Sequence, residues 1–167
     1  MRQGEQGEID SAAAIEKAVE KVGGVALHNR RMPGGRGDID HITIVPSGIY
    51  VIDTKAVTGK IEIRSRSLKP PVLFIGGRDR TTYLDGLDRQ IKAVRDALQS
   101  TEYRSVPVQA VLCFTQAGLP LLRTTEMRGH LLLHPKTLAK RLTASGPLHS
   151  EHRAPLAACL TAALRPA

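Results

Sequence analysis

The sequence predicts a mixed α/β domain whose central sheet is flanked by helices, and three observations predict it. Two amphipathic stretches, at residues 7–22 and 84–98, have the three- and four-residue apolar spacing of helices. Short runs rich in β-branched residues lie between them, and an uninterrupted apolar run follows at residues 108–115. The 167 residues contain no internal repeat and no linker, so the chain is expected to form one domain over residues 1–167.

The first helix is expected over residues 7–22, because its apolar stripe stops at Gly23-Gly24. The stripe consists of Ala12, Ile15, Val19 and Val22. Glu8 lies on the same stripe, one turn before its first apolar member. A carboxylate is unusual there unless it has a function, although an acidic residue near a helix N-terminus also interacts favourably with the helix dipole. Both interpretations of Glu8 stay open.

Strands are expected next. A short one at residues 25–27 precedes the glycine-rich loop of residues 33–37. The clearest feature is a β-hairpin of residues 39–45 and 49–55 around Pro46-Ser47-Gly48. Residues 60–66 alternate as a third strand, and residues 72–75 fit a fourth.

The second half begins with the amphipathic helix of residues 84–98, whose acidic and basic side chains we interpret as ion pairs along the helix. Residues 108–115 suit a strand buried on both faces, and residues 131–133 a short strand. Pro135 and Pro155 are expected to open helices that run through Leu142 and Leu164. The predicted order is α-β-β-β-(β)-α-β-β-α-α.

Charge and composition limit the function. The net charge of +8 favours a polyanionic partner such as nucleic acid, or an anionic membrane surface. Residues 1–59 carry 7 basic and 8 acidic residues, whereas residues 60–167 carry 17 and 8. A locally acidic segment in a basic protein is the pattern that a cation site within a polyanion-binding surface would produce. Aromatic residues make up only 3%, which argues against a base-stacking surface.

Cysteine content and hydropathy indicate the compartment. Cys113 and Cys159 lie in apolar sequence and are too few for a disulfide framework or a zinc cage. No apolar run approaches membrane-spanning length, and the N-terminus lacks the apolar region of a signal peptide. We therefore expect a cytoplasmic protein with no membrane partner. The oligomeric state is left open, a homodimer included.

The hairpin brings ionisable residues together. Asp53 and Lys55 project from one face of the second strand. If Ser47-Gly48 is a two-residue turn, Asp40 lies opposite Lys55 on that face, whereas a three-residue loop would turn Asp40 to the other side. Glycine at the second turn position favours the two-residue turn. His41 then points away from Asp40 and is interpreted as a structural hydrogen-bonding residue.

The cluster of Asp40, Asp53 and Lys55 has two interpretations. Charges on exposed strands usually form surface ion pairs that contribute little. Here the neighbouring residues are isoleucine, valine and tyrosine, so the strands are expected to be central and buried. Ionisable groups are costly in such a place unless they are paired or bind a metal, which favours a functional site.

An ordered set of residues extends beyond the hairpin. Its members are Gly4, Gly7, Glu8, His28-Asn29, Pro33, Asp38-Ile39-Asp40-His41-Ile42, Pro46, Gly48 to Lys55, Gly59-Lys60-Ile61, Gln90 and Val111-Leu112-Cys113-Phe114. This set resembles the nuclease-related domain (NERD) family of the PD-(D/E)XK nuclease superfamily. The resemblance covers about residues 4–115, and the strand and helices of residues 116–167 are less distinctive. It implies a restriction-endonuclease-like core.

The resemblance also implies chemistry: a metal-dependent nuclease that hydrolyses phosphodiester bonds, of DNA, with an activated water. It assigns Asp40 and Asp53 as ligands of Mg²⁺ or Mn²⁺, with the backbone carbonyl of Thr54 and the carboxylate of Glu8 as further ligands. Mg²⁺ prefers oxygen ligands and keeps several waters, and the scissile phosphate needs its charge neutralised. Asp38 is a weaker candidate, because it lies nearer the start of its strand.

The resemblance implies two more catalytic residues. Lys55 would position the attacking water and stabilise charge on the phosphorus. Gln90 would lie at the edge of the site, although by itself it would be interpreted as a helix-surface residue. Two alternatives to a nuclease stay open: a nucleic-acid-binding module without catalysis, and a protein-interaction scaffold on the same fold.

Basic residues after the hairpin are candidates for binding the nucleic acid backbone. They are Lys60, Arg64, Arg66, Lys69, Arg78 and Arg80. Lysine and arginine on such strands contact phosphates in nucleic-acid-binding proteins. They also protect the edge strands of sheets from aggregation, and this interpretation is equally compatible with the sequence.

Overall fold

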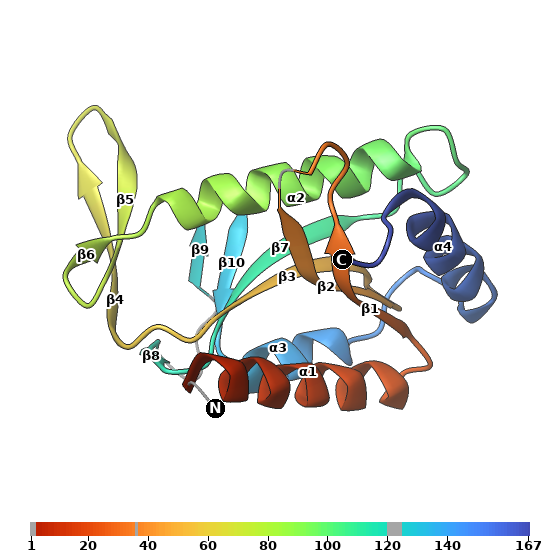
Figure 1. Ribbon diagram of the computed structural model, residues 1–167, viewed down its shortest axis with the longest axis horizontal. Coiled ribbons are helices and arrows are strands. Elements are labelled where there is room, and N and C mark those ends of the chain that lie inside the picture. The colour runs from red at the N-terminus through yellow and green to blue at the C-terminus, as the bar shows by residue number, and fades with distance from the viewer. Residues whose placement is uncertain (1–2, 36, 120–124) are drawn as a thin grey trace.

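A six-stranded sheet forms the centre of the fold (Figure 1). The computed structural model describes residues 3–35, 37–119 and 125–167, without the side chains of residues 3–10 and of Arg66. Strands follow the order β1-β2-β3-β7-β10-β9. Their bounds are Val25–Arg31 (β1), Asp38–Val45 (β2), Gly48–Lys55 (β3), Val108–Phe114 (β7), His130–Leu133 (β10) and Thr125–Met127 (β9). The first three strands are antiparallel neighbours, and β7 and β10 continue parallel to β3.

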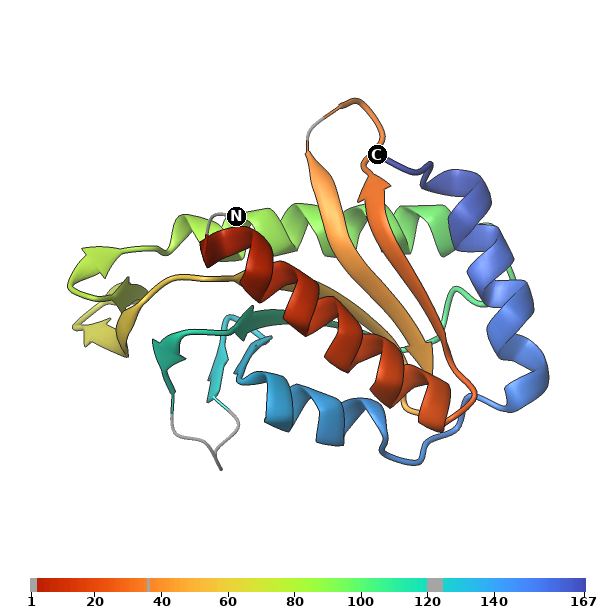
Figure 2. The same cartoon turned by 60° about the horizontal axis from the view of Figure 1, so that its bottom comes forward.

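Helices cover both faces of this sheet, which confirms the predicted mixed α/β class. Helices α1 (Gln3–Lys21) and α3 (Pro135–Leu142) lie on one face, and α2 (Thr82–Leu98) crosses the other (Figures 1 and 2). Helix α4 (Ser150–Ala163) packs on the α2 side, where Leu156 and Leu160 are fully buried with Ile42. The sheet is therefore buried on both sides, as continuous apolar strands require.

Strand alternation decides which residues face which helix. Tyr50 and Ile52 of β3 pack with Ile15 and Val19 of α1. The intervening Ile49 and Val51 pack with Val94 and Leu98 of α2. The odd-numbered residues of β3 thus face α2, and this assignment determines where Asp53 and Lys55 lie.

A smaller sheet extends beyond the central one. Its strands are β4 (Gly59–Arg66), β5 (Lys69–Ile75), β6 (Arg78–Asp79) and β8 (Ala117–Gly118), in the order β6-β5-β4-β8. We call residues 59–80 the arm. Figures 1 and 2 both show β4, β5 and β6 projecting from one end of the molecule. Strands were predicted at residues 60–66 and 72–75, and both are confirmed. Strands β6, β8 and β9 have only two or three residues and give no periodic signal.

Several predicted boundaries were wrong: α1 begins at Gln3 and not at residue 7, and β5 begins at Lys69 and not at residue 72. The strand expected at residues 25–27 continues to Arg31, because β1 pairs with β2 along its whole length. The last helix begins at Ser150, so Pro155 lies inside it. Burial of Leu156 holds this helix on the sheet, and Arg153 fixes its start by donating to the carbonyls of Leu148 and Val22. Tertiary contacts thereby outweigh the preference of proline for the first helical position.

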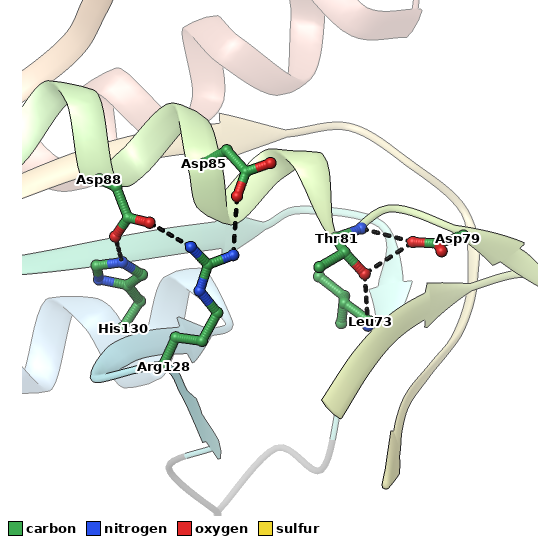
Figure 3. A network of polar contacts seen from close by, with 7 residues as sticks. All are labelled: Leu73, Asp79, Thr81, Asp85, Asp88, Arg128 and His130. Atoms are coloured by element: carbon green, nitrogen blue, oxygen red, sulfur yellow. Dashed lines mark hydrogen bonds and ion pairs between the residues drawn. The ribbon is translucent and has the colours of Figure 1, made fainter. Parts of the chain in front are cut away.

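Helix α2 is held in place by a polar network at its N-terminal half (Figure 3). Asp85 and Asp88 were predicted to form ion pairs with basic residues of the same helix, and for these two residues the prediction was wrong. Arg128 bridges them instead, with distances of 2.8 Å from Nη1 to Asp85 and 2.5 Å from Nη2 to Asp88. His130 also donates to Asp88 from 2.5 Å. Among the described side chains, Lys92 and Asp96 form the one ion pair of the predicted kind on this helix, at 2.6 Å.

A second set of bonds in Figure 3 joins the arm to the start of α2. The Thr81 hydroxyl donates to Asp79 from 2.7 Å and accepts the backbone N–H of Leu73 at 3.0 Å. Thr81 immediately precedes the helix. The end of β6, the middle of β5 and the first turn of α2 are consequently tied at one residue.

Candidate functional site

The hairpin between β2 and β3 has a different turn from the one predicted. Val45 pairs with Gly48, so the two turn residues are Pro46 and Ser47. The backbone of Gly48 has φ of +129°, and a Cβ there would lie 2.7 Å from the carbonyl oxygen of Pro107. Glycine therefore belongs to the strand, where it allows close approach of another segment, and not to the turn.

The revised turn shifts the register by two residues. His41 pairs with Ile52, so the next position along the hairpin sets Asp40 opposite Asp53 and not opposite Lys55. A shift of two leaves every side chain on its original face. Asp40, Asp53 and Lys55 therefore still converge on the face that α2 covers.

The three side chains form a compact charged group. Nζ of Lys55 lies 2.6 Å from Oδ1 of Asp53. The Asp53 side chain is 8% exposed and that of Lys55 26%, so the pair lies at the margin between core and solvent. Asp40 is fixed independently, because Oδ2 accepts the backbone N–H of Thr54 at 2.9 Å. Two carboxylates thus stand next to each other with one ammonium.

Burial makes the charge on Asp53 costly. Burial raises the pKa of Asp53, Lys55 partly opposes this rise, and the negative charge of Asp40 adds to it, so that the pKa of Asp53 is about 6. A buried carboxylate beside another carboxylate is a strained arrangement that a cation would relieve. Strongly perturbed carboxyl groups of this kind are concentrated at functional sites.

Thr54 presents its backbone to the same group. Its N–H points towards β2, where Asp40 accepts it. In a β-strand the carbonyl of a residue points to the same side as its N–H, so the Thr54 carbonyl also faces the Asp40 side. Thr54 is buried, in agreement with the place of its side chain on the face of the sheet that α1 covers.

Gln90 is buried, contrary to its interpretation as a surface residue. It is 6% exposed, and its Nε2 donates to the backbone carbonyl of Asp38 from 3.4 Å. The amide oxygen Oε1 has no hydrogen-bond partner among the described residues. Gln90 therefore links α2 to the start of β2 on the side of the sheet that carries Asp40. The Asp38 side chain itself is exposed.

Tyr83, which the sequence did not single out, adjoins this group. Its ring lies 5.0 Å from Nζ of Lys55 and 5.7 Å from the guanidinium carbon of Arg80. Tyr83 is on the first turn of α2, three residues after Arg80. A lone aromatic near a helix start gives no distinctive signal, and only the packing of α2 over β3 brings it to Lys55.

The Glu8 side chain lies outside the described residues, as does that of Arg66. The backbone of α1 runs on the opposite face of the sheet from α2. Among the described side chains, no three of His, Cys, Asp and Glu gather as a metal cage. A cation at this site would therefore use Asp40, Asp53 and backbone oxygen, which suits a hard ion that retains water.

A second polar chain lies on the α1 face. Nδ1 of His41 is 2.7 Å from Nδ1 of His28, whose Nε2 is 2.5 Å from the Glu16 carboxylate. Burial and the proximity of His28 lower the pKa of His41 to about 4. His41 is thus a neutral, hydrogen-bonded histidine on the side of the sheet away from Asp40, as interpreted from alternation. The role of Glu16 was not foreseen, because α1 and β1 meet only in the tertiary structure.

The basic candidates all lie on the arm. Lys60, Lys69 and Arg78 are exposed, and Arg64 stacks on Phe74 with 3.9 Å from its guanidinium carbon to the ring. Lys60 and Arg64 also flank Glu62 at 3.4 Å and 3.2 Å, which confirms that these three side chains share a face. None of the helices in the described part of the chain is long and apolar enough to cross a membrane.

The fold and the paired acidic strands define a class: a nuclease-like α/β core of one helix, an antiparallel hairpin that carries Asp and Asp-x-Lys, a second helix and a parallel strand. The family model described as nuclease-related domain (NERD) matches residues 3–115. The chain belongs to this family, in agreement with the resemblance and with the PD-(D/E)XK superfamily. No curated protein matches the chain, and no solved structure matches it.

Proposed function

We propose that this chain is a metal-dependent nuclease that hydrolyses phosphodiester bonds of DNA. The observation that carries the proposal is the convergence of Asp40, Asp53 and Lys55 on one side of the sheet, with Lys55 2.6 Å from Asp53. Membership of the nuclease-related domain family supports the same class of chemistry. The excess of basic residues after position 59 supports a polyanionic substrate.

The residues present fit a divalent cation. Asp40 and Asp53 supply adjacent carboxylates, and the Thr54 carbonyl faces the same side. A bound Mg²⁺ or Mn²⁺ would neutralise phosphate charge and increase the acidity of a bound water. The crowding of negative charge around Asp53 supports this assignment, because a cation removes the cost of ionising it.

The other residues at the site then have separate roles. Lys55 places a positive charge beside the buried carboxylates, where it can donate to a phosphate oxygen as negative charge develops. Tyr83 contacts the ammonium of Lys55 and limits the directions in which it can point. The amide oxygen of Gln90, which has no hydrogen-bond partner among the described residues, can orient a water at the edge of the site. Glu8, on α1, stays the further ligand that the family resemblance implies.

A cleavage assay tests the proposal. The purified chain is incubated with supercoiled, linear and single-stranded DNA and with RNA, in Mg²⁺, Mn²⁺ or EDTA. We expect metal-dependent cleavage of DNA that Asp53→Ala abolishes and that Lys55→Ala lowers by about 100-fold or more. Asp38→Asn is the matched control, because the Asp38 side chain is exposed on β2 of the same hairpin and only its backbone contacts Gln90.

Each other outcome contradicts the proposal in a defined way. Binding of nucleic acid without cleavage in any metal would identify a binding module on the nuclease fold. Neither binding nor cleavage would leave a protein-interaction scaffold, with the charged group in a structural role. Equal loss of activity in Asp38→Asn and Asp53→Ala would show that the assay reports general damage to β2 and β3.

A further inference from the structure

The arm concentrates positive charge on a projecting element. Residues 59–80 contain six basic and two acidic residues, a net +4, which is half of the +8 of the whole chain. Lys60 is 80% exposed and Arg64 50% exposed. Of the arm's apolar side chains, Leu73 and Ile75 are buried with residues of α2 and β7, whereas Lys60, Lys69 and Arg78 are exposed to solvent.

The tip of the arm carries an exposed leucine. Arg66 pairs with Lys69, so Ser67 and Leu68 form a two-residue turn. Leu68 is fully exposed, at 104%, and its φ of +61° lies in the left-handed region. Asparagine or glycine would suit both the conformation and the solvent better. Packing within the described part of the chain gives no reason for a leucine here.

The base of the arm adjoins the candidate site. The arm is inserted between Lys55 at the end of β3 and Tyr83 in the first turn of α2. Arg80, its last residue, shares the ring of Tyr83 with Lys55. A polyanion that lies along the arm is therefore led directly to the charged group of Lys55 and Asp53.

The aromatic residues indicate a double-stranded partner. Tyr50, Tyr103 and Phe114 are buried, Phe74 is covered by Arg64, and the ring of Tyr83 contacts two cations. These five are all the aromatic residues of the chain. Proteins that hold single strands use free aromatic rings on which bases stack. A projecting two-stranded ribbon with basic sides and an apolar tip instead suits a duplex groove.

We propose that the arm is a clamp on duplex DNA, in which basic side chains hold the phosphates and Leu68 enters the minor groove as a wedge between base pairs. Apolar wedges of this kind partly unstack a base step and bend the duplex. The inference rests on the proposed nuclease function and adds its substrate class. The wedge would loosen the duplex close to the site that Lys55 and Asp53 form.

The test measures binding and base unstacking without cleavage. The whole chain is titrated in EDTA into a DNA duplex that contains 2-aminopurine, whose fluorescence rises when it unstacks. We expect the wild type to raise the fluorescence and Leu68→Asn to abolish the rise, with affinity lowered by up to about tenfold. Asparagine favours the left-handed conformation, so this variant should fold at least as well as the wild type. Leu68→Met should retain the rise.

A charge variant separates clamping from wedging. We expect Lys69→Gln/Arg78→Gln to lower the slope of log affinity against log salt by about 2, since each phosphate contact contributes about 0.9. Lys92→Gln/Arg104→Gln, which removes two exposed cations outside the arm, is the matched control and should leave the slope unchanged.

Several results would overturn the clamp. These are a full fluorescence rise with Leu68→Asn, tighter binding of single-stranded DNA than of duplex, and equal binding of duplex RNA. Failure of the nuclease function has a different signature: the wild type would bind and unstack the duplex in EDTA but leave it intact in Mg²⁺ and Mn²⁺. Absence of binding to every nucleic acid would refute both proposals.

Discussion

Two buried side chains of the hairpin have pKa values shifted in opposite directions, and substitution can separate their effects on the free energy of unfolding. Burial raises the pKa of Asp53 from 3.8 to about 6 and lowers that of His41 from 6.5 to about 4. The two residues lie on adjacent strands but on opposite faces of the sheet. The folded chain favours the neutral form of each side chain, because burial at both positions disfavours the charged form.

The sign of each effect follows from proton binding. Between about pH 4 and 6 the folded chain holds the Asp53 proton more tightly than the unfolded chain, so Asp53 makes folding more favourable as the pH falls. Between about pH 6.5 and 4 the unfolded chain protonates His41 more readily, so His41 makes folding less favourable over the same range. Each contribution amounts to about 2 kcal/mol between roughly pH 7 and pH 4.5.

The two contributions nearly cancel in the wild type, and single variants should reveal them. Relative to the wild type, Asp53→Asn should lose about 2 kcal/mol of unfolding free energy on acidification from about pH 7 to 4.5. His41→Gln should gain about 2 kcal/mol over the same interval. Urea unfolding in EDTA at several pH values measures these differences, and the change with pH matters more than any constant offset.

Asp38→Asn is the control for the carboxyl series, because this exposed side chain lies on the same hairpin. Its unfolding free energy should follow that of the wild type across the range. If Asp53→Asn also ran parallel to the wild type, burial would not disfavour the charge of Asp53. If His41→Gln lost stability on acidification faster than the wild type, the conclusion that His41 is neutral in the folded chain would be wrong.

Two further predictions concern elements that position the site. Gly48→Ala should lower the unfolding free energy by about 3 kcal/mol, because φ is +129° and the new Cβ would meet the Pro107 carbonyl at 2.7 Å. Gly34→Ala, with φ of +81° but open space, should cost only about 1 kcal/mol, and equal losses in urea unfolding would contradict the steric argument. Arg128→Gln should cost about 1 kcal/mol at low salt, and less at high salt, because its ion pairs with Asp85 and Asp88 are partly exposed. A cost that does not depend on salt would show that the arginine acts through packing.

The face that Asp40, Asp53 and Lys55 share could be predicted because it depends only on alternation along two strands. The predicted turn, Ser47-Gly48, was wrong, and hence the partner predicted for Asp40 was wrong as well. The convergence of Asp40, Asp53 and Lys55 was nevertheless right, because both candidate turns have two residues and differ by an even shift. The exact register depends on Pro107, which is distant in sequence and approaches Gly48.

Long apolar periods determined the main helices and the buried strand β7, because burial of an amphipathic face needs no knowledge of its partner. The start of α3 followed from Pro135, since proline suits the first helical position. Contacts between distant segments decided the rest. Gln90 is buried because α2 crosses β2, and Arg128 bridges Asp85 and Asp88 because the β9–β10 turn reaches α2. Tyr83 lies next to Lys55 because α2 packs over β3. Local sequence therefore determines the face of an element on which a side chain lies. Which residue of another element that side chain contacts depends on how the whole elements pack.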